Sequence, residues 1–402
     1  MKLVEFVPST PHPLWKLCPQ MGITDVIVKV NPDLTGLPDP WRYDTLASIV
    51  SRLKSAGLTV VGLEGDPFDM TPIKEYGAGE FLTGFTRFTG LRELGALHPA
   101  LSSPAATSLR SGDTPDPNNL VNPVNPVKNE SGDEKREEAL AHYRELLESM
   151  GKLGIKLLCY NFMVGKGWSR TGVREGRGGA KATYFSLEAM NHAEQVGQAE
   201  LHASTCSTWL KLSHDQVWAN YEYFIKAVMP TAEKCGVRMG LHPDDPCLPS
   251  LGGYARIFGS VEAYDRAYAI YPSPSNAVTF CQANFKLMLG NGERGMGNGA
   301  TEKLIKMIRH FGKRIAFIHV RDVEGAKEDF TELFHDQGTT DQFALMRTYR
   351  ELGLDVPVRG DHVPEMAYDR ELTPEGTPGY FTLGRLFANG YLKALLQGTT
   401  NN

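Results

Sequence analysis

Four residues of the types that bind metal ions recur at nearly regular intervals in the second half of the chain. His242, Cys281, His319 and Asp361 are separated by 39, 38 and 42 residues, and each lies at the end of a short apolar run. Imidazole, thiolate and carboxylate groups are the usual protein ligands of zinc and other divalent transition metals. If the fold brings these four side chains together, they predict a divalent metal site.

The elements around these residues alternate between strand and helix. Eight apolar runs rich in β-branched residues predict strands at 2–7, 25–30, 58–65, 155–162, 237–243, 277–283, 314–320 and 355–362. Helical patterns ending in glycine lie at 43–57, 138–154, 217–236, 302–312 and 341–353, and a last helix is expected at 384–397. Such alternation is typical of parallel strands joined by right-handed crossovers. Eight of them predict an α/β fold, a closed (β/α)8 TIM barrel that forms a single domain over residues 1–402.

An open doubly wound sheet is the alternative fold. It fits less well, because neither a G-x-G-x-x-G motif after an early strand nor a Walker loop occurs in the sequence. In a barrel, the carboxyl ends of neighbouring strands converge at one mouth. Each of the four residues alone is more typical of a structural histidine, a core cysteine or a helix cap, but the set on four successive strands favours a metal site.

Two insertions add length to the barrel. Residues 99–136, after the third strand, are rich in Pro, Ser, Asn and Asp, a composition typical of a flexible loop. Residues 164–216, after the fourth strand, include the basic, glycine-rich stretch 165–182. Both follow strands and are therefore expected over the mouth, the second as a lid and either of them alternatively as a surface insertion.

Composition excludes several classes of protein. The chain has 402 residues, 41% hydrophobic and 22% charged, with a net charge of −5 and no Lys/Arg-rich stripe, so we expect no nucleic-acid partner. Apolar runs of the ~20 residues needed to span a bilayer are absent, as is a signal peptide at the start of this sequence, so we expect no membrane association and a cytoplasmic location. The six cysteines are scattered, which is typical of reduced thiols.

Several motifs resemble the mannonate dehydratase family, bacterial enzymes of hexuronate catabolism with a xylose-isomerase-like barrel. They are "CYNFM" (159–163), "WSRT" (168–171), "GVRMGLHPDDP" (236–246), "FIHVRD" (317–322), "VRGDH" (358–362) and "PGYFTLGRL" (378–386), and the resemblance covers most of residues 20–80 and 140–397. It implies the same four metal ligands, and it places the family's proton-transfer pair on His362 and Tyr380. It also implies Mn²⁺ or Fe²⁺; we favour Mn²⁺, although zinc suits the ligand types as well.

The activity implied is that of a hydro-lyase that converts D-mannonate, or a close aldonate, to a 2-keto-3-deoxy acid and water. Departures from the family pattern lie near the mouth: Cys281-Gln-Ala-Asn284 replaces C-T-G-S, and Arg359-Gly-Asp-His-Val-Pro364 replaces R-P-D-H-G-H. They leave two alternatives open. One is a metal-dependent sugar or sugar-acid isomerase or epimerase, and the other is a non-catalytic sugar-acid-binding barrel.

Further residues are candidates for substrate binding. Arg321 and Arg359 are suited to clamp a carboxylate. Asp244 and Asp245 are expected to orient metal ligands, bind sugar hydroxyls or cap the next element. The remaining candidates, all in loops after strands, are Asn161, Arg170 and His335. The expected partners are a small sugar acid and further copies of the chain in a homo-oligomer.

Overall fold

A computed structural model describes residues 1–30, 39–78, 131–165, 167–195, 212–289 and 299–399. Its main sheet is parallel and runs in the order β1-β15-β12-β11-β8-β5-β4-β3-β2. The strands are β1 (Lys2–Leu3), β2 (Glu5–Pro8), β3 (Asp25–Lys29), β4 (Thr59–Glu64), β5 (Leu157–Tyr160), β8 (Arg238–Leu241), β11 (Asn276–Cys281), β12 (Ile315–Val320) and β15 (Pro357–Gly360). The first apolar run closes the barrel, because β1 pairs with β15 while β2 pairs with β3. The predicted TIM barrel is confirmed.

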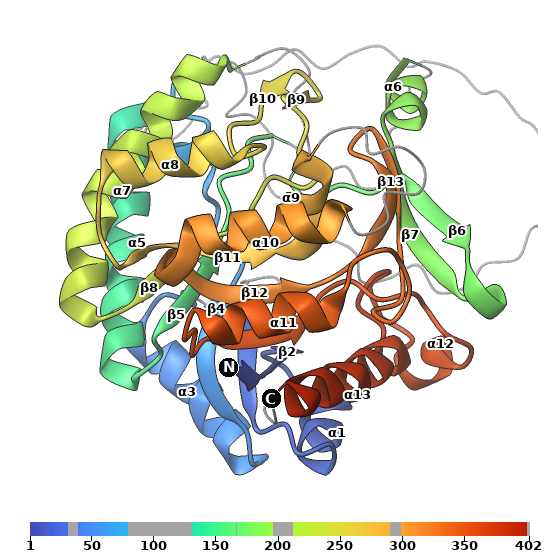
Figure 1. Ribbon diagram of the computed structural model, residues 1–402. Helices are drawn as coiled ribbons and strands as arrows, with labels where there is room; N and C mark the ends of the chain where they lie inside the picture. Colours follow the sequence, from blue (N-terminus) through green and yellow to red (C-terminus); the bar gives the residue numbers. More distant parts are fainter. Residues whose placement is uncertain (31–38, 79–130, 166, 196–211, 290–298, 400–402) are drawn as a thin grey trace, which may run out of the picture.

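Helices surround the sheet (Figure 1). They are α1 (Leu14–Gln20), α3 (Tyr43–Ser55), α4 (Thr71–Lys74), α5 (Gly132–Leu153), α7 (His214–Cys235), α8 (Val261–Ile270), α9 (Gln282–Met288), α10 (Gly299–Phe311), α11 (Gln342–Glu351), α12 (Asp369–Leu372) and α13 (Thr382–Gly398). Capping boxes at Ser131 and Ser213 start α5 and α7, and Gly154 and Gly236 end them in the left-handed conformation. The prediction for α5 began six residues late because its first turn is polar, and α8 and α9 were not predicted.

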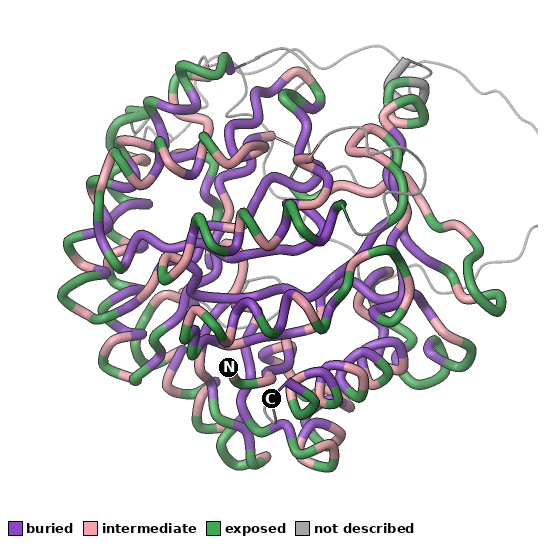
Figure 2. The backbone as a smooth tube through the Cα atoms, in the orientation of Figure 1, coloured by how far each residue is buried: buried purple, intermediate pink, exposed green. Residues whose placement is uncertain are grey.

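Strand side chains alternate between two cores. Val26 and Val28 of β3 pack in the large cluster between strands and helices. Ile27 instead belongs to a smaller cluster inside the barrel, with Val4, Leu157, Cys159, Ala277, Ala316 and Phe317. The strands are buried along most of their length (Figure 2). This alternation fixes which strand residues point into the lumen.

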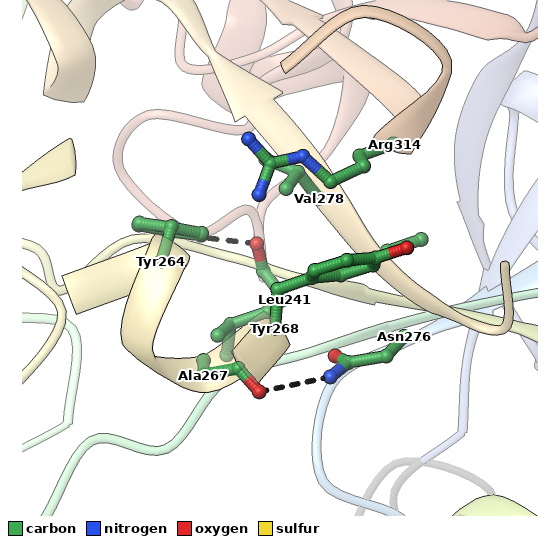
Figure 3. Close-up of a pocket in the computed structure, with 8 residues that line it drawn as sticks. Leu241, Tyr264, Ala267, Tyr268, Asn276, Val278 and Arg314 are labelled. Atoms are coloured by element: carbon green, nitrogen blue, oxygen red, sulfur yellow. Dashed lines mark hydrogen bonds between the residues drawn. The ribbon is translucent and has the colours of Figure 1, made fainter. Parts of the chain in front are cut away.

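Helix α8 packs on the outer face of β8 and β11. The hydroxyl of Tyr264 donates to the carbonyl oxygen of Leu241 at 3.5 Å, and the side-chain amide of Asn276 donates to the carbonyl oxygen of Ala267 at 3.1 Å (Figure 3). A small pocket beside these contacts is lined by Tyr268, Val278 and Arg314, among others. Because it lies between helix and strands, it belongs to the packing of the barrel wall and not to its mouth.

The second insertion builds a small sheet. After β5 the chain forms β6 (Gly172–Glu175), the 3₁₀ turn Arg177–Gly179, β7 (Lys181–Ser186) and α6 (Leu187–Gln195). The loop after β12 forms β13 (Val323–Ala326) and β14 (Asp329–Glu332). These four strands make an antiparallel sheet in the order β13-β14-β7-β6. The insertion expected as a lid is therefore, over residues 172–186, a hairpin joined to the loop that follows β12.

The first predicted insertion, residues 99–136, is described only in its last part. Most of the predicted flexible insertion, up to residue 130, lies outside the described residues. The prediction of a loop is wrong for its last part, 132–136, because these residues form the first turns of α5.

Among the described helices, none has the length and hydropathy that a membrane span requires.

Candidate metal centre

The four predicted metal ligands meet at the mouth of the barrel. His242 directly follows β8, Cys281 ends β11, His319 is next to last in β12, and Asp361 directly follows β15. One donor atom from each of the four lies within 4.8 Å of the other three. Asp361 Oδ2 is 3.7 Å from His319 Nδ1 and 4.0 Å from Cys281 Sγ. Four neighbouring strands thus supply one ligand-type side chain each, as the spacing predicted.

The two histidines are prepared to bind a cation. His242 Nδ1 lies 2.8 Å from the carbonyl oxygen of Pro243, which can only accept, so Nδ1 carries the proton and Nε2 has a free lone pair. Both ring nitrogens of His319 are buried without a hydrogen-bond partner among the described residues. Burial lowers the pKa of His242 to about 4 and that of His319 well below its usual value, so both rings are neutral. A buried, unpaired, neutral imidazole fits a metal ion.

The two anionic candidates differ in how the protein holds their charge. Burial raises the pKa of the Cys281 thiol to about 12, against the opposing effect of Arg321. A bound cation would instead favour the thiolate. Burial alone would also raise the pKa of Asp361, but His362, Arg359, His319 and Arg321 together hold it well below its usual range. The donor set therefore fits a divalent ion.

Arg321 and Arg359 are both fully engaged with protein acceptors. Arg321 donates to Glu332 at 2.8 and 2.6 Å, to Asp245 at 2.9 Å and to Asn284 at 2.7 Å. Arg359 donates to Glu64 at 3.1 and 2.6 Å, and it lies 3.0 Å from Asp361 Oδ1. These contacts make the two arginines supports of the ligand cluster. The predicted clamp on a substrate carboxylate would require them to give up these bonds.

Asp244 and Asp245 are also turned inward. Asp245 accepts two bonds from Arg170, at 2.7 and 3.0 Å, besides the one from Arg321. Asp244 accepts from the backbone N–H of Phe258 at 2.8 Å. Both carboxylates are buried. Of the roles considered from the sequence, these contacts favour orienting the site over binding sugar hydroxyls.

His362 and Tyr380 form a hydrogen-bonded pair beside Asp361. His362 Nε2 lies 2.9 Å from the hydroxyl oxygen of Tyr380, and this hydroxyl is also 3.4 Å from Asp361 Oδ1. The indole of Trp168 packs edge-on against both rings, with centroid separations of 5.1 and 6.3 Å, and is 37% exposed. Burial raises the pKa of Tyr380 well above its usual value, with a further contribution from Asp361. The phenol is therefore a neutral proton donor.

Sequence reasoning missed Glu332, the last residue of β14. Its Oε1 atom lies 3.1 Å from His362 Nδ1 and 2.6 Å from Arg170 Nη2. Burial would raise the pKa of this carboxyl, but Arg321, Arg170 and His362 outweigh burial and lower it to about 2. An ionised carboxylate at Nδ1 favours the tautomer that carries the proton there. In "DFTELF" (329–334), Glu332 lies two residues after Phe330, so on a strand both side chains face the same way and the acidic one is expected to be buried. This pattern can be recognised only once β14 is known to be a strand.

Glu64, at the end of β4, was also missed. Its Oε2 atom lies 3.7 Å from His319 Nε2, and its carboxylate binds Arg359. It forms a second group of donor atoms with Cys159 and His319, all within 4.8 Å of one another. The rule that selected the four ligands, a polar residue at the end of a barrel strand, would have selected Glu64 as well.

The other predicted substrate contacts have structural partners. His335 Nε2 is 2.8 Å from the carbonyl oxygen of Val320, and the ring is buried. Asn161 accepts from Lys74 Nζ at 3.1 Å. Arg170 is buried between Asp245 and Glu332 and so ties the second insertion to the site. Of the departures from the family pattern, Asn284 is held by Arg321 and donates to the carbonyl oxygen of Asp244, which makes it part of the support.

Comparisons with known proteins identify the family to which the chain is similar. A family model described as D-mannonate dehydratase (UxuA) matches residues 118–402. Mannonate dehydratase 2 of Halalkalibacterium halodurans is 27% identical over 288 residues, 67% of this chain and 79% of that protein. Mannonate dehydratase of Streptococcus equi subsp. zooepidemicus is 29% identical over 279 residues, 65% of this chain and 74% of that protein.

Solved structures show the same fold. A mannonate dehydratase from Streptococcus suis serotype 2 superposes with a TM-score of 0.68 at 22% identity, covering 100% of this chain and 95% of that one. A xylose isomerase domain protein from Planctomyces limnophilus gives a TM-score of 0.51 at 11% identity, covering 100% of this chain and 99% of that one. Because the family match spans well over half of the sequence, the chain belongs to the D-mannonate dehydratase (UxuA) family.

Proposed function

We propose that the chain is a metal-dependent hydro-lyase that removes water from D-mannonate, or from a close aldonate, and yields a 2-keto-3-deoxy acid. The observation that carries this proposal is the hydrogen-bonded pair His362–Tyr380 beside Asp361, within the cluster of ligand-type residues. The names of the relatives support it, since those proteins are called mannonate dehydratases.

Four residues would hold the metal ion, namely His242, Cys281, His319 and Asp361. Mn²⁺ is the ion we propose, with Fe²⁺ next and Zn²⁺ less suited, because an ion that keeps open positions leaves room for a chelating substrate. When bound, a divalent ion supplies Lewis-acid stabilisation of the negative charge that develops beside the carboxylate as C2 loses its proton.

The protein's own groups move the protons. Dehydration takes a proton from C2 and donates one to the hydroxyl that leaves C3, so one group must accept while another donates. We assign the proton of His362 to Nδ1, facing the ionised Glu332, which leaves Nε2 as the accepting atom. Tyr380 is neutral and hydrogen-bonded to that atom. We assign His362 as the base at C2 and Tyr380 as the donor to the leaving hydroxyl.

The surrounding ion pairs hold these groups in place. Arg170 and Arg321 both bind Asp245 and Glu332, and all four side chains are at least nine-tenths buried. A buried network with its hydrogen bonds satisfied resists reorganisation, which keeps His362 oriented through the reaction. Trp168 covers the pair on one side and limits the access of water to it.

An aldonate panel tests the proposal. The Mn²⁺-loaded protein would be incubated with epimeric aldonates and the products analysed by mass spectrometry, with the His362→Asn variant as the control for background activity. Loss of one water from D-mannonate or a close epimer, in the wild type only, is the expected result. A product of unchanged mass would identify an isomerase or epimerase instead. Binding of aldonates without any turnover would identify a sugar-acid-binding barrel.

A further inference from the structure

Lys29 ends β3 and points into the mouth of the barrel. Ile27, two residues earlier, belongs to the lumen cluster, whereas Val26 and Val28 pack toward the helices. Side chains two residues apart on a strand share a face, so the side chain of Lys29 extends into the lumen at the carboxyl end. That end also holds the metal-ligand candidates.

The register of the strands places Lys29 in the layer of the candidate metal centre. Lys29 is paired with Glu64 on β4, and Glu64 is paired with Cys159 on β5. Donor atoms of Glu64 and Cys159 lie within 4.8 Å of His319. Neighbouring parallel strands are about 4.8 Å apart. Lys29 therefore sits one strand beyond Glu64, on the side of the mouth that supplies none of the four proposed metal ligands.

Among the described residues, Lys29 differs from the other cations of the mouth in having no hydrogen-bond or ion-pair partner. Arg170 and Arg321 bind Asp245 and Glu332, Arg359 binds Glu64, and Lys74 binds Asp66 at 2.6 Å. Within the described part of the chain, Lys29 forms neither a hydrogen bond nor an ion pair, and its side chain is half-buried. Burial lowers its pKa, partly offset by Glu64. An ammonium group that is partly removed from water is stabilised when a hydrogen-bond acceptor binds to it.

Lys29 lies outside residues 118–402, the part of the chain that the family model matches. We propose that Lys29 binds the substrate. Its ammonium group donates to oxygen atoms of the sugar-acid chain beyond C3, at the end away from the proposed metal ligands. This rests on the proposed function and adds to it a contact that selects acids with an oxygen-bearing chain beyond the reacting carbons. Lys29 then contributes to binding and selectivity and takes no part in proton transfer.

The test compares Lys29→Met and Lys29→Arg with wild type and with Lys54→Met, a matched change of an exposed lysine on α3. For Lys29→Met we expect KM for the turned-over aldonate to rise about tenfold or more with kcat nearly unchanged, as for loss of a charge-assisted hydrogen bond made equally in ground and transition states. Metal content and melting temperature should stay at wild-type values, and Lys29→Arg should recover part of the affinity.

Shortened substrates give a second readout. A four-carbon aldonate lacks the far end, so calorimetric binding to Mn²⁺-loaded wild type and Lys29→Met should be equally weak. A six-carbon aldonate and the corresponding aldarate should both bind better to wild type, and their difference shows whether Lys29 prefers a hydroxyl or a carboxylate. Unchanged KM and affinity in Lys29→Met would overturn the inference while leaving the dehydratase proposal intact. Tight aldonate binding that depends on Lys29 but leads to no turnover would overturn only the dehydratase, and absence of binding in wild type would overturn both.

Discussion

The imidazole of His362 and the phenol of Tyr380 share a hydrogen bond of 2.9 Å, although 18 residues separate them in the chain. The two rings lie between two carboxylates: Glu332 is 3.1 Å from His362 Nδ1, and Asp361 Oδ1 is 3.4 Å from the hydroxyl oxygen of Tyr380, whose single proton can go to either Nε2 or Asp361. Glu332 is the proposed acceptor of the histidine proton, and Asp361 belongs to the candidate metal centre. The pair is thereby connected to both the support and the proposed ion.

Removing either member of the pair should greatly reduce turnover and leave the metal content unchanged. His362→Asn and Tyr380→Phe should each retain wild-type metal content, because neither is among the four ligand candidates. Each should lose turnover by about 10²–10⁴-fold, the usual size of general acid–base catalysis. Steady-state kinetics and elemental analysis on the same preparations measure both quantities. Nearly full activity in Tyr380→Phe would reduce Tyr380 to a packing residue against Phe6, whose ring lies 5.9 Å away.

Solvent exchange separates the two roles. If His362 is the base, Tyr380→Phe should still exchange the C2 proton of the substrate with deuterated water, while His362→Asn should not. The opposite pattern would exchange the two assignments.

Cys281 should be required for metal binding. The purified protein is expected to carry about one divalent ion per chain, and Cys281→Ala should lose most of it, because one of four converging donors disappears. Cys247→Ala is the matched control, since Cys247 is equally buried but lies outside the cluster. Full metal content in Cys281→Ala would restrict the site to two histidines and an aspartate.

The convergence of the ligands could be predicted from sequence because it depends on the topology of the barrel. Once eight alternating strands are recognised, residues at equivalent ends must meet, and the strand-end rule selects His242, Cys281, His319 and Asp361 without knowledge of any contact. In a closed barrel of eight strands, the first apolar run must also lie beside the last strand, as the pairing of β1 with β15 shows.

The support around the ligands could not be predicted in this way. Arg321 and Arg359 were interpreted as substrate clamps because an arginine near a mouth is suited to bind a carboxylate, and nothing local in the sequence reveals that Glu332 and Glu64 occupy them. Arg359 and Glu64 lie on strands that are 295 residues apart in the chain. Arg321 and Glu332 are only 11 residues apart, but Glu332 lies on β14, which pairs with β7 of the second insertion.

Arg170 should anchor the second insertion. Its guanidinium is buried between Asp245 and Glu332, so Arg170→Ala should lower the free energy of unfolding by about 3–5 kcal/mol, the usual cost of breaking a buried ion pair. Arg174→Ala on β6 is the control, because its pair with Asp329 is 40% and 52% exposed and worth about 0–1 kcal/mol. Denaturant titration measures both, and limited trypsin digestion should cut residues 172–186 faster only in Arg170→Ala. Equal stability losses in the two variants would contradict an anchoring role.

Glu332 should act on His362 through orientation, without contacting the substrate. Glu332→Gln preserves the shape but weakens the hold on Nδ1, so we expect kcat to fall by about 10–100-fold, as for other residues that orient catalytic or ligand histidines, with KM little changed. The pH–rate profile should shift as well, because the charge beside the imidazole is lost. Glu324→Gln, at an exposed position on β13, is the matched control. An unchanged pH–rate profile would show that Glu332 serves only to pair the arginines.

The same carboxylate should make stability depend on pH. The folded pKa of Glu332 is lowered from 4.5 to about 2, because Arg321, Arg170 and His362 outweigh burial. A depressed folded pKa contributes stability that is fully present above the unfolded value and is lost as pH falls through the folded one. The free energy of unfolding of wild type should therefore decline more steeply than that of Glu332→Gln as pH is lowered from about 4.5 toward 2. Parallel curves in urea titrations across this window would mean that folding does not lower the pKa of Glu332, and the proposed charge on this side chain beside His362 would lose its support.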